Sequence, residues 1–326
     1  MNGSPPRGGH GGTEPSRGRT LFVTGGTGFV GARLVEHLRS RGHRVVLLVR
    51  PGRTGGLPEC DDVVEGDPMR WGPWWGELRR CDAAVNLAGE PIHGRWTPDK
   101  KARIRDSRVL TTRNLVDAVP PGRPFTLFSA SAVGVYGDAG ERELDEGAPP
   151  GEDFLARVAR EWEEEALRAR DKGARVVIGR FAVVLGPGGA LLRMDEMAGK
   201  GLAGPLGGGR QWVSWIHRED AVRAVSFLLG RSDLKGVFNL AAPEPVRQAE
   251  FVRTAAEVSG RRRGAPVPAF AVRLVLGEAA SVVLSSQRML PRRLLEAGFV
   301  FRFPELRPAL EDVLSRGSPT GGGPSP

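Results

Sequence analysis

Short apolar runs alternate with amphipathic segments along the first half of the chain. The runs show little alternation of apolar and polar positions, which is typical of parallel strands covered on both faces. The segments between them repeat apolar residues with helical spacing. Strand and helix in turn predict an α/β fold with a doubly wound parallel sheet. The expected strands are residues 21–24, 44–49, 62–65, 83–87, 125–128 and 175–184, and the expected helices follow residue 31 and span 98–119 and 153–170.

The length of 326 residues suits one large two-lobed α/β unit or two modest domains, and the second half carries further strand and helix signals that are harder to assign. Both ends of the chain are rich in Gly, Pro and Arg without apolar periodicity, so they are expected to be disordered. The division expected is a tail at 1–18, a first domain at 19–185, a lobe at 186–315 that can interleave with it, and a tail at 316–326. The lobe's expected strands are 211–216 and 237–240, and its helices 217–229, 248–258, 269–284, 291–296 and 306–314.

The stretch at residues 20–31, TLFVTGGTGFVG, carries the clearest chemical signal. Gly25, Gly28 and Gly31 have the spacing G-x-x-G-x-x-G between a strand and a helix. Such a turn directs unpaired N–H groups and the positive end of the helix dipole at a bound phosphate. The spacing alone is weak in a chain with 46 glycines, and a plain strand-to-helix turn is the alternative. The flanking strand and helix favour a Rossmann domain that binds a dinucleotide.

Arg50 bears on which dinucleotide binds. In NAD-specific folds an Asp or Glu closes the second strand and holds the ribose 2′-hydroxyl. Here the strand closes with Val49 and Arg50, followed by Pro51. A guanidinium suits a 2′-phosphate, so NADP(H) is preferred, with a surface arginine before a turn as the alternative. Ala88 and Gly89 end the fourth strand with small residues that let a cofactor ribose approach the backbone.

Composition and charge narrow the class of protein. The 326 residues are 40% hydrophobic and 26% charged, as in globular proteins, and no apolar run is long enough to span a membrane. The net charge is +9, but the basic residues are spread out, so we expect no nucleic-acid binding. The N-terminus lacks the apolar segment of a secretory signal. Cys60 and Cys81 have no CxxC spacing, which predicts a cytoplasmic protein without a metal site. A homodimer is compatible with the sequence.

Three polar residues in the first domain are candidates for chemistry or cofactor binding. Arg180 interrupts a buried strand and needs an anionic partner, either a cofactor phosphate or a buried carboxylate. Ser131 and Tyr136, the only tyrosine, follow the fifth strand, where hydride transfer needs proton handling. Packing between domain and lobe is the equal alternative for Tyr136. On the helix at 153–170, the run EWEEE (161–165) is expected to face water.

Five motifs in order resemble the extended, epimerase-like branch of the short-chain dehydrogenase/reductase superfamily: TGGTGFVG, VNLAGEPI, GRWTPDKKARIRDSR, FSASAVGVYGD and GGRQWVSWIHRED. The atypical subfamily labelled NAD-dependent epimerase/dehydratase or cell-division-inhibitor homologue is more similar still. The end of the chain resembles that subfamily's C-terminal domain of unknown function, and the match spans residues 19–315. The resemblance implies a Rossmann sheet with a smaller C-terminal α/β lobe, and NADP(H) bound across the strand ends. The implied cofactor contacts are Gly25, Gly26, Thr27, Gly28, Phe29, Val30, Gly31, Val49, Arg50, Leu87, Ala88, Gly89, Arg103, Arg108 and Arg180.

The chain departs from the active members of the superfamily in one respect that matters. Those members carry Tyr-x-x-x-Lys on the helix after the fifth strand, and the Lys lowers the pKa of the Tyr. The corresponding helix here has neither residue, although Ser131 matches the serine that polarises a substrate carbonyl. Without that Lys, the pKa of Tyr136 is expected near its usual value of about 10.

Other groups could replace the missing pair in proton transfer, namely Glu90, Asp153 and His217. For His217, a structural contact with an aspartate is the favoured alternative. Separately, the loop at 199–209 could close over a ligand. The resulting hypothesis is an NADP(H)-dependent oxidoreductase or epimerase-like enzyme for a small carbonyl or hydroxyl compound. The alternative is a non-catalytic NADP(H)-binding sensor or interaction protein. Ser131 and Tyr136 are the candidate catalytic residues.

Overall fold

A seven-stranded parallel sheet forms the centre of the computed structural model, which describes residues 18–53, 55–187, 204–260, 262 and 264–317. The strands are ordered β11-β7-β5-β4-β1-β2-β3, so the order reverses between β1 and β4. In such sheets a ligand binds outside the carboxyl ends of the strands at that reversal. The strands are β1 (Thr20–Thr24), β2 (Arg44–Val49), β3 (Asp62–Glu65), β4 (Ala83–Asn86), β5 (Thr126–Ala132), β7 (Arg175–Phe181) and β11 (Gly236–Leu240).

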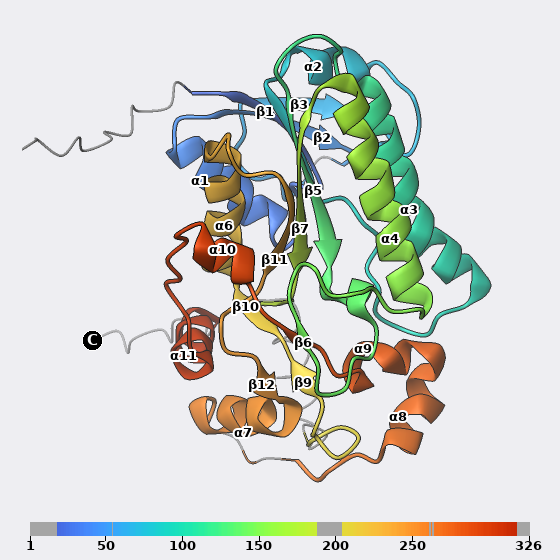
Figure 1. Cartoon of the computed structure of the whole chain (residues 1–326), viewed down its shortest axis with the longest axis vertical. Coiled ribbons are helices and arrows are strands. Elements are labelled where there is room, and N and C mark those ends of the chain that lie inside the picture. The colour runs from blue at the N-terminus through green and yellow to red at the C-terminus, as the bar shows by residue number, and fades with distance from the viewer. Residues whose placement is uncertain (1–17, 54, 188–203, 261, 263, 318–326) are drawn as a thin grey trace, which may run out of the picture.

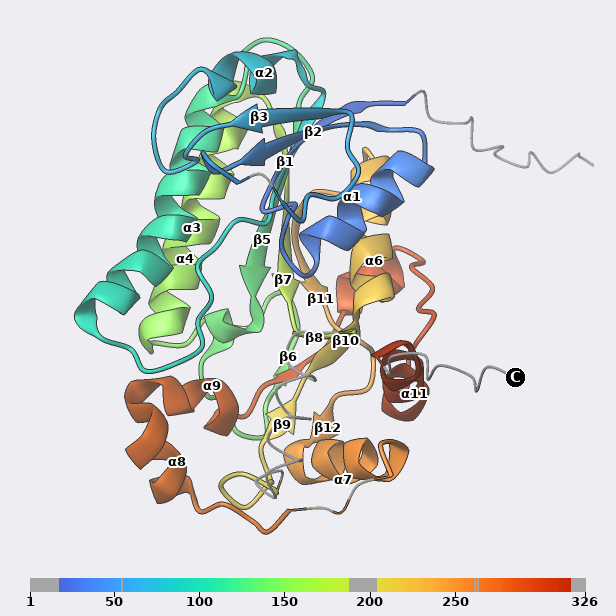
Figure 2. The same cartoon turned by 180° about the vertical axis from the view of Figure 1, so that it is seen from behind.

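Helices cover both faces of this sheet (Figures 1 and 2). On one face lie α1 (Gly31–Ser40) and α6 (Arg218–Gly230), which bury residues such as Leu34 and Leu228. On the other face lie α2 (Trp74–Arg80), α3 (Pro98–Ala118) and α4 (Phe154–Leu167), over a core that includes Trp74. The continuous apolar runs of the strands are explained by this double cover, and the predicted doubly wound fold is confirmed.

The C-terminal lobe occupies the lower half of Figure 1 and has its own small core. Two two-stranded pairs link it to the first domain: β8 (Val183–Leu185) with β10 (Trp215–His217), and β6 (Glu143–Leu144) with β13 (Arg288–Met289). A third pair, β9 (Trp212–Val213) with β12 (Val246–Arg247), lies within the lobe. Its helices are α7 (Gln248–Val258), α8 (Ala269–Leu276), α9 (Ser281–Leu284), α10 (Arg292–Glu296) and α11 (Leu306–Gly317). Strand β11 and helix α6 return to the central sheet, so the two parts interleave.

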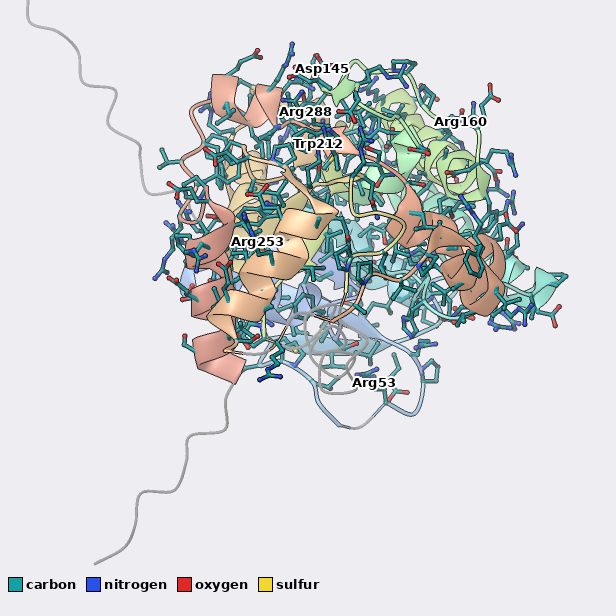
Figure 3. The ribbon with its side chains drawn as sticks, turned by 90° about the horizontal axis from the view of Figure 1, so that it is seen from below. Arg53, Asp145, Arg160, Trp212, Arg253 and Arg288 are labelled. Atoms are coloured by element: carbon teal, nitrogen blue, oxygen red, sulfur yellow. The ribbon has the colours of Figure 1, made fainter. Side chains whose placement is uncertain are left out.

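Trp212 joins strands of the lobe that are distant in sequence. The Arg247 guanidinium carbon lies 3.9 Å from its ring centroid, and that of Arg288 lies 4.7 Å from it. Arg288 comes from β13 and Trp212 from β9, and Figure 3 shows the two side chains together on the lobe side. Glu141 accepts a hydrogen bond from the indole of Trp212 and pairs with Arg247 at 2.6 Å. Stacking and charge together hold the short strands in place.

The structure corrects several expected boundaries. The helix expected at 269–284 is interrupted by Gly277, where φ is +60° and a 3₁₀ turn, η3 (Gly277–Ala280), separates α8 from α9. The strand expected at 175–184 divides into β7 and β8 at Ala182. Helix α11 extends to Gly317, two residues into the expected tail. The N-terminal tail at 1–17 and residues 199–203 of the loop at 199–209 lie outside the described residues.

Within the described part of the chain, no helix is both long and apolar enough to cross a membrane. The cysteines expected to be free are unbridged, and Cys81 is buried against the end of α2.

Candidate functional site

The glycine-rich turn connects β1 to α1 at the point where the strand order reverses. Gly25 has φ +71°, and a Cβ there would lie 2.5 Å from the carbonyl carbon of Leu87. A Cβ on Gly31 would lie 2.2 Å from the carbonyl oxygen of Gly25. The turn is closed by a hydrogen bond from Gly28 N to Gly25 O at 3.0 Å. Only glycine fits at positions 25 and 31, so the spacing seen in the sequence has a steric cause.

The N-terminus of α1 is open to an anion. Val30 occupies the N-cap position, no side chain of the described residues caps the helix, and its first turn carries no acidic residue. The positive end of the helix dipole therefore has no built-in negative partner. Phe29, in the turn, packs under the guanidinium of Arg218, whose Cζ lies 5.0 Å from the ring centroid. Arg218 therefore places a positive charge beside the glycine-rich turn. Its position in the sequence did not indicate this.

A cluster of charged side chains lies beside the end of β2. Glu90 pairs with Lys100 at 2.8 Å and faces Arg103 at 3.9 Å. The hydrogen bond from Lys100, together with the charges of Lys100, Arg103 and Arg50, lowers the pKa of Glu90 below its usual value. Arg50 itself is exposed directly after the buried Val49. Arg50 and Arg103, both predicted cofactor contacts, thus lie around Glu90. Lys100 lies there too, although the sequence analysis did not single it out.

Asn86 fixes the backbone where β1 and β4 end. Its side chain accepts a hydrogen bond from Thr24 at 2.8 Å and donates one to Thr112 of α3 at 2.8 Å. All three side chains are buried. Leu87 and Ala88, the residues that follow Asn86, lie against Gly25.

Arg108 reaches from α3 to the end of β4. Its Nη1 donates to the carbonyl oxygens of Glu90 at 3.0 Å and Ile104 at 2.9 Å. Its guanidinium stacks on Trp162 of α4, with Cζ 5.5 Å from the ring centroid, and a Cβ on Gly89 would lie 3.1 Å from that Cζ. Burial lowers the pKa of Arg108 to about 10, partly offset by the charge of Glu90. The side chain is held in one orientation.

A cavity of about 220 Å³ adjoins Arg108 where β5 and β7 end. Apolar side chains from α4 form one wall, and α9 with the segment after it forms the opposite wall. Asp153 is the carboxyl group that lines it, and this aspartate also caps α4 by accepting from Ala156 N at 2.8 Å. The lining includes Leu155, Val158, Trp162, Ser281, Ser285 and Gln287.

Arg180 has a buried carboxylate partner inside the protein. Its Nε and Nη2 donate to the two carboxylate oxygens of Glu163 at 2.8 and 2.7 Å. Ser131 Oγ donates to the same carboxylate at 2.5 Å. The sequence analysis expected either a cofactor phosphate or a buried carboxylate as the partner of Arg180, and the structure shows the carboxylate. The positive charge of Arg180 is therefore compensated without a cofactor phosphate. Glu163 is 8% exposed, which shows that the expectation of a water-facing 161–165 run was wrong at this position.

Tyr136 is 1% exposed and belongs to the same buried network. Its hydroxyl accepts from Arg180 Nη1 at 2.9 Å and lies 2.7 Å from Asn239 Oδ1 and 2.9 Å from the carbonyl oxygen of Asp145. Burial raises the pKa of Tyr136, against the opposing effect of Arg180, so the expectation of an unshifted value was wrong. The two candidate catalytic residues, Ser131 and Tyr136, are thus both engaged beneath the cavity by protein partners.

Replacing Tyr136 with phenylalanine is expected to lower the free energy of unfolding by about 1–3 kcal/mol, because Asn239 and Arg180 lose a buried partner. The affinity for a dinucleotide should stay unchanged, since the hydroxyl faces the network. Urea unfolding and a dinucleotide titration on the same variant measure both quantities. Undiminished stability together with lost turnover would instead assign the hydroxyl to catalysis.

His217 makes a structural contact with an aspartate, but the partner is Asp312 rather than the nearby Asp220. His217 Nε2 lies 3.3 Å from Asp312 Oδ2 of α11. Asp220 accepts instead from the backbone of Arg302 and Phe303 at 2.8 and 2.7 Å. Both contacts hold the C-terminal segment against α6. No group of three His, Cys, Asp or Glu side chains suited to a metal occurs among the described residues.

The comparisons with known proteins agree with this geometry. Residues 21–241 match the model of the NAD dependent epimerase/dehydratase family, and residues 267–313 match the domain of unknown function DUF1731. The chain belongs to the NAD dependent epimerase/dehydratase family. An Arabidopsis thaliana relative, "Epimerase family protein SDR39U1 homolog, chloroplastic", is 40% identical over 301 residues, covering 90% of this chain and 86% of the relative. The predicted resemblance, including the separate C-terminal domain, is confirmed.

Two solved structures show how closely the fold is shared. The human epimerase family protein SDR39U1, crystallised with NADPH, superposes with a TM-score of 0.79 at 34% identity, covering 91% of this chain and 99% of that one. A nucleoside-diphosphate sugar epimerase from Corynebacterium glutamicum superposes with a TM-score of 0.72 at 31% identity, covering 92% of this chain and 59% of the other. The function of this chain is argued below from its own site.

Proposed function

We propose that this protein binds NADP(H) across the carboxyl ends of the sheet and acts as an oxidoreductase or epimerase-like enzyme on a small carbonyl or hydroxyl compound. The observation that carries the proposal is the glycine-rich turn under an uncapped α1, with Arg50 rather than a carboxylate at the end of β2. The human relative that crystallised with NADPH supports the same cofactor.

The cofactor contacts follow from the geometry. The turn at residues 25–31 would hold the pyrophosphate, and Arg218 would add a positive charge near it. Arg50 would bind the 2′-phosphate, with Lys100 and Arg103 beside it. Leu87, Ala88 and Gly89 would lie against the ribose. Bound NADPH would supply a hydride to a carbonyl carbon. Side chains of this protein would have to bind the substrate, orient it and exchange the proton.

Proton transfer has a different arrangement here from that of the active superfamily members. The face of α4 that lines the cavity presents Leu155, Val158 and Trp162, with no phenol and no ammonium group. Neither Glu90 nor His217 lines the cavity. Glu90 pairs with Lys100, and His217 is buried against Asp312. Asp153 does line it. We therefore assign to Asp153 the exchange of a proton with the substrate oxygen.

The second candidate function is a non-catalytic NADP(H)-binding protein. The engagement of Ser131 and Tyr136 by Glu163, Arg180 and Asn239 favours it, because neither hydroxyl is available to a substrate. The two functions differ in the result of Asp153→Asn. Loss of NADPH oxidation with unchanged NADPH affinity supports an enzyme. Absence of turnover in the unmodified protein, across small carbonyl compounds, supports the binding function.

Replacing Arg50 with glutamine is expected to weaken NADPH binding by about 10- to 100-fold, because a charge-assisted hydrogen bond contributes about 1.5–3 kcal/mol. NADH, which lacks the 2′-phosphate, should bind with unchanged affinity. The measurement is a fluorescence titration with each nucleotide.

Arg44→Gln is the matched control for this variant. Arg44 begins the same strand, at its amino end, and it pairs there with Asp62 at 2.6 Å. The control should leave both affinities unchanged. Equal losses of NADPH and NADH in Arg50→Gln would show that Arg50 does not contact the 2′-phosphate.

A further inference from the structure

One carboxylate lies inside the cluster of cations to which the proposed function assigns the 2′-phosphate. Glu90 Oε1 accepts a hydrogen bond from Lys100 Nζ at 2.8 Å and lies 3.9 Å from Arg103 Nε. The positive charge of Arg50 acts on the same carboxylate. Arg50 itself is exposed and forms no ion pair with another described residue. The cluster therefore holds a negative charge of its own before any nucleotide binds.

The ion pair between Glu90 and Lys100 is partly shielded from water. The side chain of Lys100 is 16% exposed and that of Glu90 is 28% exposed. Salt screens an exposed ion pair strongly and a partly buried one much less. The hydrogen bond from Lys100, together with the neighbouring positive charges, keeps the pKa of Glu90 below its usual value. Glu90 is therefore ionised at neutral pH, when a nucleotide approaches.

The backbone of Glu90 is held in a fixed position relative to α3. Its N–H donates to Ser107 Oγ at 2.9 Å, and its carbonyl oxygen accepts from Arg108 Nη1 at 3.0 Å. Both partners are residues of α3, the helix that also carries Lys100 and Arg103. A nucleotide that binds beside these cations therefore meets the carboxylate as well.

NADPH and NADH bring different groups to this cluster. A phosphate monoester carries about −1.5 to −2 charges at pH 7, whereas the 2′-hydroxyl of NADH is neutral. A carboxylate repels the phosphate, because the two have like charge. The same carboxylate can accept a hydrogen bond from a ribose hydroxyl, as the acidic residue of NAD-specific folds does. Glu90 thus opposes the binding of one nucleotide and not of the other.

We infer that Glu90 sets the preference of this protein between NADPH and NADH, because its carboxylate competes with the 2′-phosphate for Lys100 and Arg103. When NADPH binds, Lys100 exchanges the carboxylate for the phosphate. The inference rests on the proposed function, which places the adenosine ribose beside Arg50. It adds an acidic residue that limits the preference for NADPH to the basic residues that create it.

The test compares the affinities of Glu90→Gln for both nucleotides by fluorescence titration. Adenosine 2′,5′-bisphosphate and 5′-AMP, which differ only in the 2′-phosphate, are titrated calorimetrically in parallel. We expect Glu90→Gln to bind NADPH about three- to tenfold tighter than the unmodified protein does, and NADH no tighter. The bisphosphate should gain affinity as NADPH does. Glu90→Asp keeps the negative charge, so its ratio of the two affinities should resemble that of the unmodified protein.

Glu161→Gln is the matched control. It removes the same charge from the protein, and Glu161 pairs with Arg105, a residue of the same helix as Lys100, at 2.7 Å. Both affinities should stay unchanged in this variant.

Three results would contradict the inference. Unchanged or weaker NADPH binding in Glu90→Gln, or an equal gain for NADPH and NADH, would overturn it and leave the proposed cofactor in place. If Glu90→Gln fails to fold, Lys100→Gln decides instead. A loss of affinity for NADPH alone supports the exchange at Lys100, and an unchanged ratio of the two affinities overturns it. Failure of the unmodified protein to bind NADPH would overturn both the inference and the proposed function.

Discussion

Replacing Glu163 with alanine is expected to lower the free energy of unfolding by about 3–5 kcal/mol, because it leaves the buried Arg180 without its counter-charge. Both carboxylate oxygens accept from Arg180, and Ser131 donates to the same group. The variant thus removes the partner of several buried donors at once. Arg180 is 9% exposed and cannot recover those hydrogen bonds from water without moving β7.

Glu164→Ala is the control for this prediction. Glu164 is the next residue of the same helix, it is exposed, and it forms no ion pair with another described residue. Its replacement should change the free energy of unfolding by no more than about 0.5 kcal/mol. Guanidinium chloride unfolding of the two variants measures the difference. A loss below about 1 kcal/mol in Glu163→Ala, within the range of surface pairs, would contradict a buried charge network.

Replacing Gly31 with alanine is expected to weaken NADPH binding by about tenfold or more, since each 1.4 kcal/mol of lost contact energy is about tenfold in Kd. The added Cβ would lie 2.2 Å from the carbonyl oxygen of Gly25 and 2.8 Å from the Cα of Gly26. These are backbone atoms that no side-chain rotation can move aside. The start of α1 has to shift away from the turn, and its N-terminal N–H groups then no longer point at the pyrophosphate.

Gly76→Ala serves as the control for Gly31→Ala. Gly76 lies inside α2, where a Cβ would meet nothing within 4 Å. Alanine there should leave NADPH affinity unchanged and keep or raise stability, since alanine favours a helix over glycine. Titration of both variants with NADPH gives the comparison. Unchanged affinity in Gly31→Ala would show that the cofactor does not use this turn.

The sequence was sufficient to predict the sheet and the glycine-rich turn, and the reason is local. The apolar run at 44–49 coincides with β2, because a strand buried on both faces leaves an unbroken hydrophobic signal. The strand predicted at 62–65 coincides with β3, an edge strand on which Val63 is exposed. Gly25 and Gly31 are needed for steric reasons that a spacing pattern records directly. The position of Arg50 directly after β2 was predicted from the end of the apolar run at Val49.

The polar network under the cavity was harder to predict, because its members come from separate elements. Glu163 stands in a run of acidic residues that looks water-facing, and only the packing of α4 against β5 and β7 turns it towards Arg180. The buried strand position of Arg180 did signal that a carboxylate was needed, but not which one. Arg218 was missed for the same reason, since Phe29 is distant from it in sequence. Lys100 is ten residues from its partner Glu90, and it was missed because it stands in a basic run.

The predicted helix boundaries in the lobe were wrong for a different physical reason. Residues 269–284 are apolar and continuous in pattern, yet Gly277 adopts φ +60° and breaks the helix. That break orients α9 so that Ser281 and Ser285 line the cavity. A glycine inside an apolar helical pattern is a weak signal, because glycine is tolerated there at a cost of about 1 kcal/mol relative to alanine.

The measurement that tests the central claim most directly is hydrogen–deuterium exchange of the unmodified protein with and without NADPH. We predict slower exchange on NADPH binding at the backbone amides of the turn at residues 25–31 and at Arg50. The amides of α7, at the bottom of the lobe in Figure 1, should be unaffected. Unchanged exchange at the turn and at Arg50 in the presence of saturating NADPH would contradict the account.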